Sequence, residues 1–171
     1  FLEIKYPTHI LPLLELDNKY TKNNNNTHRE TNGKWIPIKL EMNNIYNYKN
    51  NHSIDFQKLP QNEIISIHGK NGSGKSKILE TLLLAIYGCP PKDLTHIITQ
   101  GQKKGNTSIT ILLNNNIFQI NRSYNKNGKS IPAPIITKND INISGTSKID
   151  NQNFINQLLG TKEDLEDTHI S

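Results

Sequence analysis

The sequence lacks the residues that hold disulfide-rich or zinc-bound domains together. Cysteine occurs once in 171 residues, at Cys89, so there is no disulfide framework and no paired-cysteine metal site. The six histidines are far apart, and none forms a His-Glu-x-x-His type of spacing with another. These absences argue against a disulfide scaffold and against a metal centre built from side chains. We expect Cys89 itself to be buried at the end of a helix.

Apolar residues are also scarce, at 33% of the chain, with 6% aromatics. No stretch approaches the 18 apolar residues of a membrane-spanning helix, and the first residues lack the layout of a signal peptide. We therefore expect no membrane association, and a cytoplasmic, nucleoid or nuclear location. Asparagine is abundant, as in 23–26 and 114–116, a usage typical of AT-rich genomes. If the source is a phage or a large DNA virus, the location is the interior of the host cell.

The charge balance is mildly basic. Twenty Lys and Arg residues against fifteen Asp and Glu residues give a formal net charge of +5. This excess is compatible with a nucleic acid nearby, and equally with phosphate binding or ordinary lysine usage. A chain of this length is long enough for one domain with a core.

The pattern along the chain predicts an unassigned extension or linker over residues 1–34 and a domain over 35–171. Alternation predicts a strand over 36–48, paired with 50–56 as a hairpin. A second hairpin is predicted from 107–113 and 117–124, around the asparagines between them. A polar loop is predicted over 125–134.

Further elements follow from apolar spacing. The β-branched segment 63–68 predicts a buried strand. Residues 77–88 predict a helix ended by Gly88, and 149–160 a helix ended by Gly160, with Thr161 and Asp164 capping the next one. The expected apolar face of the first helix consists of Ile78, Leu79, Leu82, Leu83 and Ile86.

The segment GKNGSGKS, residues 69–76, matches the P-loop pattern between a predicted strand and a predicted helix. Its three glycines let the backbone turn its N–H groups inward around an anion, and the helix adds its positive end. Lys75 is expected to reach the β- and γ-phosphates of ATP, and Ser76 to bind Mg²⁺. The predicted nucleotide-binding residues are Gly69, Lys70, Asn71, Gly72, Ser73, Gly74, Lys75, Ser76 and Lys77.

Residues 36–165 resemble the N-terminal lobe of SMC-like ATPases of DNA repair, above all SbcC and the ATPase subunit of phage recombination exonucleases. The resemblance rests on the layer ending in IDF, the NGSGKS loop, the helix KILETLLLAIYG and the hairpin strand FQINRSY. It implies an α/β fold, a P-loop NTPase of ABC/SMC head type, as an N-terminal lobe with an accessory antiparallel β-layer. An arginine that other members carry in the first hairpin is replaced by Tyr46.

The resemblance also implies an activity and partners. The full-length protein would be an ATPase that acts with a nuclease subunit on DNA double-strand breaks, as a homodimer that sandwiches ATP between its heads. The Q-loop, signature motif, Walker B acids and coiled coil of the family would follow residue 171, so the catalytic residues are unknown. We expect the chain by itself not to hydrolyse ATP.

Two other classes remain open. One is an SMC or RecF-like DNA clamp without a nuclease, and the other is the ATPase subunit of a transporter. Heptads with a central CxxC after residue 171 would favour repair, and a hinge domain would favour SMC. Two basic groups could contact DNA or be solvated turns: a hairpin tip of Arg122, Lys126 and Lys129, and the pair Lys103 and Lys104. The aromatic residues Tyr46, Tyr48 and Phe56 are expected to pack rather than to stack on bases.

Overall fold

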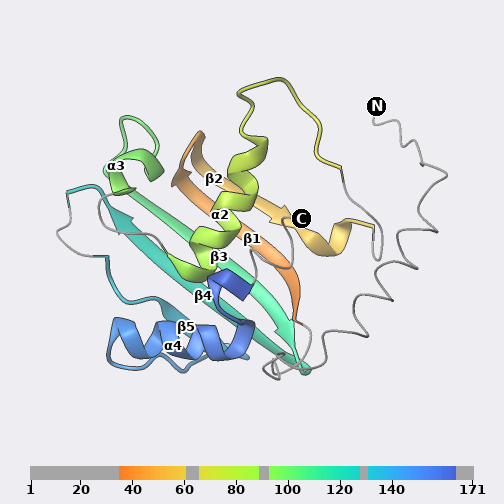
Figure 1. Ribbon diagram of the computed structural model, residues 1–171, viewed down its shortest axis with the longest axis vertical. Coiled ribbons are helices and arrows are strands. Elements are labelled where there is room, and N and C mark those ends of the chain that lie inside the picture. The colour runs from red at the N-terminus through yellow and green to blue at the C-terminus, as the bar shows by residue number, and fades with distance from the viewer. Residues whose placement is uncertain (1–34, 61–65, 89–92, 128–130, 165–171) are drawn as a thin grey trace. The chain divides into compact units, whose positions relative to one another are not determined.

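The computed structural model describes residues 35–60, 66–88, 93–127 and 131–164 (Figure 1). Contacts divide the chain into two units, Phe1–Thr31 and Asn32–Ser171, and every described residue belongs to the second. The predictions for residues 1–34, Cys89 and Lys129 lie outside the described ranges. The domain division stays a prediction.

The described strands form one six-stranded sheet in the order β2-β1-β3-β4-β5-β6, with all neighbours antiparallel. The first predicted hairpin is confirmed with its turn at residues 46–47, so Tyr48 begins the second strand instead of ending the first, and the second predicted hairpin is confirmed. The two short strands after residue 134 were not predicted. The strands are β1 (Ile36–Ile45), β2 (Tyr48–Asp55), β3 (Lys104–Leu113), β4 (Asn116–Asn125), β5 (Ile135–Lys138) and β6 (Ile141–Asn142).

Asparagine and aspartate form the tight turns between these strands. Asn114 and Asn115 have φ of 49° and 60° between β3 and β4, and Asn139 and Asp140 have 48° and 65° between β5 and β6. Two-residue hairpin turns need two left-handed residues in succession, and Asn and Asp accept that conformation more easily than other side chains. The asparagine-rich composition therefore has a structural use at the β3–β4 turn.

The sheet is apolar on one face and polar on the other. A row of paired apolar residues crosses five strands, because Leu40 pairs with Ile54 and Ile109, Ile109 with Ile120, and Ile120 with Ile136. The neighbouring positions on these strands, which point to the opposite face, are polar apart from the exposed Ile135 in β5. They include Glu41, Ser53, Ser108 and Asn121. Because strand side chains alternate, this pattern fixes which face is buried.

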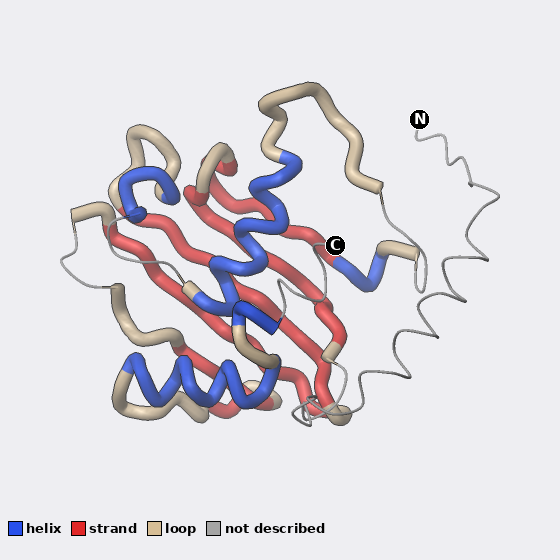
Figure 2. The backbone as a smooth tube through the Cα atoms, viewed as in Figure 1, coloured by secondary structure: helices blue, strands red, loops and turns tan. Residues whose placement is uncertain are grey.

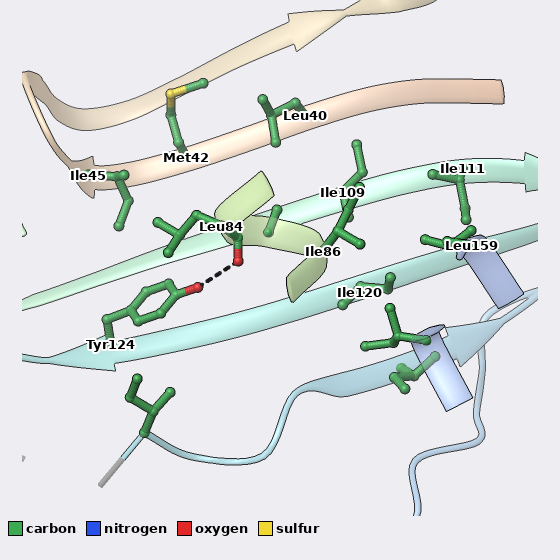
Figure 3. Close-up of a cluster of buried hydrophobic side chains, with 14 of the residues drawn as sticks. Leu40, Met42, Ile45, Leu84, Ile86, Ile109, Ile111, Ile120, Tyr124 and Leu159 are labelled. Carbon is green, nitrogen blue, oxygen red and sulfur yellow. Dashed lines mark hydrogen bonds between the residues drawn. The ribbon is translucent and has the colours of Figure 1, made fainter. Parts of the chain in front are cut away.

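Two helices cover the apolar face, α2 (Lys75–Tyr87) and α4 (Lys148–Leu159), as Figure 2 shows. Helix α2 crosses β1, β3 and β4, and its Leu84 and Ile86 enter the same buried cluster as the strand residues (Figure 3). Two short segments complete the described fold, the 3-10 turn η1 (Phe56–Lys58) and α3 (Leu94–Ile97). The core therefore lies between one sheet face and two helices.

The face of α2 that packs on the sheet differs from the predicted one. Its buried residues are Thr81, Leu84, Ala85 and Ile86, whereas the predicted Leu79 is 51% exposed. The prediction was wrong for Leu79 but right for Ile86, which is buried. Apolar residues surround the helix, so periodicity alone does not select the face. The predicted end is confirmed, because the N–H of Gly88 bonds Leu84 O at 2.9 Å.

The C-terminal helix agrees with its prediction. Helix α4 ends at Gly160, which has φ of 91° and donates its N–H to Asn156 O at 3.0 Å. The Asp164 carboxylate then accepts from the N–H and the hydroxyl of Thr161, both at 2.8 Å. This pair caps the next turn as predicted.

The predicted strand over 63–68 is not found in its described part. Ser66, Ile67 and His68 belong to no strand, and Ile67 is 53% exposed. A buried strand of this type needs partner strands at its edges, and none of the six described strands pairs with these three residues. Residues 63–65 lie outside the described ranges.

Candidate nucleotide-binding loop

The P-loop forms an exposed turn that leads directly into α2. Residues 69–73 are exposed, and Gly72 and Gly74 have φ of 80° and 93°. An L-residue rarely adopts this left-handed conformation, so both positions require glycine. Inside the turn the N–H of Ser73 donates to Lys70 O at 3.1 Å. A Cβ on Gly69 would come within 2.9 Å of the Ser73 hydroxyl oxygen, so a larger residue there would require the Ser73 side chain to move.

The side chain of Lys75 crosses the loop that precedes it. Its ammonium donates to the carbonyls of Gly69 at 2.8 Å and Lys70 at 3.0 Å. A flexible glycine-rich turn is thereby tied to the first residue of the helix. The positive charge is held next to the inner surface of the turn, at the place where an anion is expected.

The first turn of α2 is unfavourable for an isolated helix. Gly74 at the N-cap supplies no side-chain hydrogen bond, and the first turn contains Lys75 and Lys77 but no acidic residue. The N-terminus of a helix carries a partial positive charge, so cations there are destabilising and anions stabilising. This end of α2 therefore favours an anionic ligand.

Ser76 and Lys77 have different surroundings. Ser76 is exposed, so its hydroxyl is accessible at the helix start. Lys77 donates its backbone N–H to Gly74 O at 2.9 Å, and its ammonium bonds both oxygens of Glu80, at 2.8 and 2.6 Å. The same ammonium lies 4.7 Å from the centroid of the Tyr46 ring. The Glu80 carboxylate therefore offsets the charge of Lys77 at the helix start.

Sequence reasoning missed the contribution of Tyr48 to the loop. Its hydroxyl donates to Gly74 O at 3.1 Å, across 26 positions of sequence. Partial burial raises the pKa of Tyr48 above its ordinary value through desolvation. The predicted packing role holds for Tyr46, Tyr48 and Phe56, which are partly buried against the core. No local sequence signal marks Tyr48, because the contact is long-range.

Arg122 does not belong to a basic hairpin tip, so that prediction was wrong. The side chain is 3% exposed, and it bonds the carbonyls of Ala85 and Ile86 at the end of α2 and Gln152 of α4. Arg122 points to the covered face because it alternates in phase with Ile120 and Tyr124 along β4. It stabilises the fold and cannot reach DNA.

Three exposed lysines lie at the end of the β3–β4 pair opposite the asparagine turn. Lys104 begins β3 and pairs with Asn125, while the N–H of Lys126 bonds Lys103 O at 2.9 Å. The structure thus brings Lys126 beside Lys103 and Lys104, which were predicted from the sequence to be a separate basic group. Lys103, Lys104 and Lys126 are called the lysine cluster below.

A hollow of about 410 Å³ lies on the polar face of the sheet, away from the P-loop. Its lining is mostly neutral amides and hydroxyls, and its one carboxylate, Glu41, is paired with Lys39 at 2.6 Å. It contains no residue of 69–77 and no lysine or arginine among its lining residues. It therefore lacks the charge that a polyphosphate site needs.

In the part of the chain that the structure describes, no helix is long and apolar enough to cross a membrane.

A sheet covered by helices, with a glycine-rich loop at a helix N-terminus, fits the predicted fold class, an α/β P-loop ATPase fold. A family model described as an AAA domain matches residues 39–170. The chain belongs to this AAA domain family, and its resemblance to SMC-like ATPases of the ABC class is confirmed.

Three curated relatives are similar over most of this chain. An uncharacterised protein of Acanthamoeba polyphaga mimivirus is 27% identical over 151 residues, which are 81% of this chain and 11% of the relative. The SbcC component of nuclease SbcCD from Staphylococcus aureus is 28% identical, over 75% of this chain and 14% of the relative. The DNA double-strand break repair Rad50 ATPase of Methanocaldococcus jannaschii is 30% identical, over 70% of this chain and 12% of the relative. The chain therefore spans only a small part of these relatives.

Among solved structures, the recombination mediator protein RecF aligns with a TM-score of 0.48 and 16% identity, over 81% of this chain and 35% of that chain.

Proposed function

We propose that this chain binds ATP with Mg²⁺ through residues 69–77. The proposal depends on the backbone geometry of the glycine turn and on the charge at the start of α2. Two left-handed glycines lead into a helix that begins at Lys75 and has no acid in its first turn, while the charge of Lys77 is paired with Glu80. Such a turn gathers backbone N–H groups and positive charge around one point, which suits the phosphates of a nucleotide.

Each of these residues would make a different kind of contact with the bound nucleotide. The turn from Gly69 to Gly74, with Lys70, Asn71, Gly72 and Ser73, supplies backbone N–H groups at close approach. Lys75 supplies a mobile charge that can move from the Gly69 and Lys70 carbonyls to a phosphate oxygen. The exposed hydroxyl of Ser76 would hold Mg²⁺, which lowers the repulsion between phosphate oxygens. Lys77 fixes the first turn by its N–H and its ion pair with Glu80.

We further propose that the chain is the ATP-binding half of an SMC-like ATPase that works with a nuclease subunit in DNA double-strand-break repair. The support is the similarity to a component of nuclease SbcCD and to a Rad50 ATPase. On this proposal the partners are DNA, the nuclease and a second copy that closes over ATP, and the location is the cell interior. The mimivirus relative and the asparagine-rich composition support a viral or phage source.

The test measures binding of Mg²⁺-ATP by calorimetry to the parent chain, to Lys75→Ala and to Lys126→Ala. Lys75→Ala removes both the charge and the tie across the loop, so we expect its binding to fall below detection. Lys126→Ala removes an exposed lysine elsewhere and should keep the parent affinity. Unchanged affinity in Lys75→Ala would refute the assigned role of the loop.

A further inference from the structure

The turn between β1 and β2 touches the start of α2 at two points. Tyr46 lies under the Lys77 ammonium, and the Tyr48 hydroxyl donates to the Gly74 carbonyl at 3.1 Å. Gly74 has no Cβ, and one added there would lie 3.2 Å from the Tyr48 hydroxyl oxygen. Glycine at this position therefore serves both the left-handed backbone and the close approach of the tyrosine.

The Gly74 carbonyl is the first acceptor of the helix. It accepts the N–H of Lys77 at 2.9 Å as well as the Tyr48 hydroxyl. In a planar trans peptide the C=O and the following N–H point in opposite directions. Fixing the Gly74 carbonyl along the helix therefore fixes the N–H of Lys75 away from the helix, toward the position of a bound anion.

The backbone around Tyr46 and Tyr48 is itself held in place by a separate segment of the chain. The N–H of Tyr46 bonds Ile97 O at 2.5 Å, and the N–H of Thr99 bonds Asn44 O at 3.0 Å. Thr99 also donates its hydroxyl to Tyr48 O at 3.4 Å. Ile45 bridges Ile98, and both are buried. The β1–β2 turn is thus anchored to α3 and the residues after it, and offers the P-loop a fixed point.

We propose that Tyr48 is a positioning residue of the nucleotide site, which holds the Gly74–Lys75 peptide in the orientation that binds phosphate. The proposal rests on the proposed function of the loop. Glycine-rich turns have many backbone conformations, and ordering them on binding lowers the affinity. The Tyr48 hydrogen bond fixes the orientation of the Gly74–Lys75 peptide before a ligand binds. A tyrosine phenol is protonated over the neutral range even at its ordinary pKa, and burial raises the pKa of Tyr48 further, so its hydroxyl stays a donor.

The test compares Tyr48→Phe with Tyr87→Phe in the full chain. Tyr87 is a matched control, because it also donates its hydroxyl to backbone carbonyls, of Gly160 and Thr161, but at the other end of α2. The probes are Mg²⁺-ATP and inorganic tripolyphosphate, which has no base or sugar. We expect Tyr48→Phe to bind both probes about three- to tenfold more weakly, the range of one lost hydrogen bond, and Tyr87→Phe to bind like the parent.

A second measurement needs no ligand. Hydrogen exchange of the Lys77 amide reports on the first turn of α2, because this amide bonds Gly74 O. We expect faster exchange in Tyr48→Phe than in Tyr87→Phe, with urea midpoints of the two variants close to each other. A general loss of stability would lower the midpoint and would not be confined to this amide.

The outcomes separate the two proposals. Equal affinity of Tyr48→Phe and the parent, with Lys75→Ala unable to bind, overturns the role of Tyr48 and keeps the loop. A loss confined to ATP, with tripolyphosphate unchanged, also overturns it, because the tyrosine would then contact the base or sugar. No binding of either probe by the folded parent overturns both proposals.

Discussion

Arg122 in β4 donates its Nε to the carbonyl of Ala85 in α2 at 2.8 Å. The same guanidinium reaches Ile86 O at 2.5 Å and Gln152 of α4 at 2.6 Å, while Tyr124, two residues along, donates to Leu84 O at 3.0 Å. Helix α2 has no basic residue in its last turn. The sheet therefore supplies the positive charge and the donors that the C-terminal end of this helix needs.

Replacing this arginine should damage the fold. Arg122→Met would leave buried carbonyls without charged donors, so we expect the free energy of unfolding to fall by about 2 to 4 kcal/mol. Arg122→Lys should recover only part of the loss, because an ammonium cannot reproduce the planar fork. Urea unfolding measures the change, and Lys126→Met serves as the exposed control with a change near zero. A stability loss no larger than the control's would contradict the structural role.

Two buried threonines should respond in opposite directions to the same change. Within the described residues, Thr107 Oγ1 has no hydrogen-bond partner, whereas Thr81 Oγ1 donates to Lys77 O at 2.5 Å. Thr107→Val exchanges an unsatisfied hydroxyl for a methyl group and should stabilise the chain by about 1 kcal/mol. Thr81→Val should destabilise it by about 0.5 to 1.5 kcal/mol. Thermal and urea unfolding of the two variants measure both changes. A loss of stability in Thr107→Val would disprove the assignment of its hydroxyl as unsatisfied.

The lysine cluster tests the proposed contact with DNA. If Lys103, Lys104 and Lys126 neutralise phosphates, replacing all three by alanine should weaken duplex binding. It should also reduce the slope of log affinity against log salt by about one unit per lost contact. The measurement is a salt titration of binding by fluorescence anisotropy. Lys39→Ala is the control, because its ammonium is engaged by Glu41 at 2.6 Å. An unchanged slope in the triple variant would place DNA elsewhere on the protein.

Much of the fold could be predicted because its signals are local. The P-loop pattern, the two hairpins and the capped ends of α2 and α4 each depend on residues a few positions apart. The short strands β5 and β6 were not predicted, although Asn139 and Asp140 between them give the same turn signal as Asn114 and Asn115. The residues Asn139 and Asp140 therefore predict a hairpin turn from the sequence alone.

Other features depend on contacts that no local pattern encodes. Apolar residues surround α2, so only the sheet decides that Leu84 is buried and Leu79 exposed. A basic residue near a polar loop predicts a surface cation, yet the alternation of β4 turns Arg122 inward, where carbonyls of α2 accept its hydrogen bonds.

The sequence by itself determined the chemistry of the proposed site, because the glycine turn, the lysine and the hydroxyl that we propose to hold the anion are neighbours in the chain. Only the tertiary structure decided what holds that turn in place. Tyr48 and Gly74 are 26 positions apart, and Arg122 and Ala85 are 37 apart. Such pairs meet only after the sheet has formed and α2 has packed on it, since their geometry depends on strand register and helix orientation rather than on neighbouring residues.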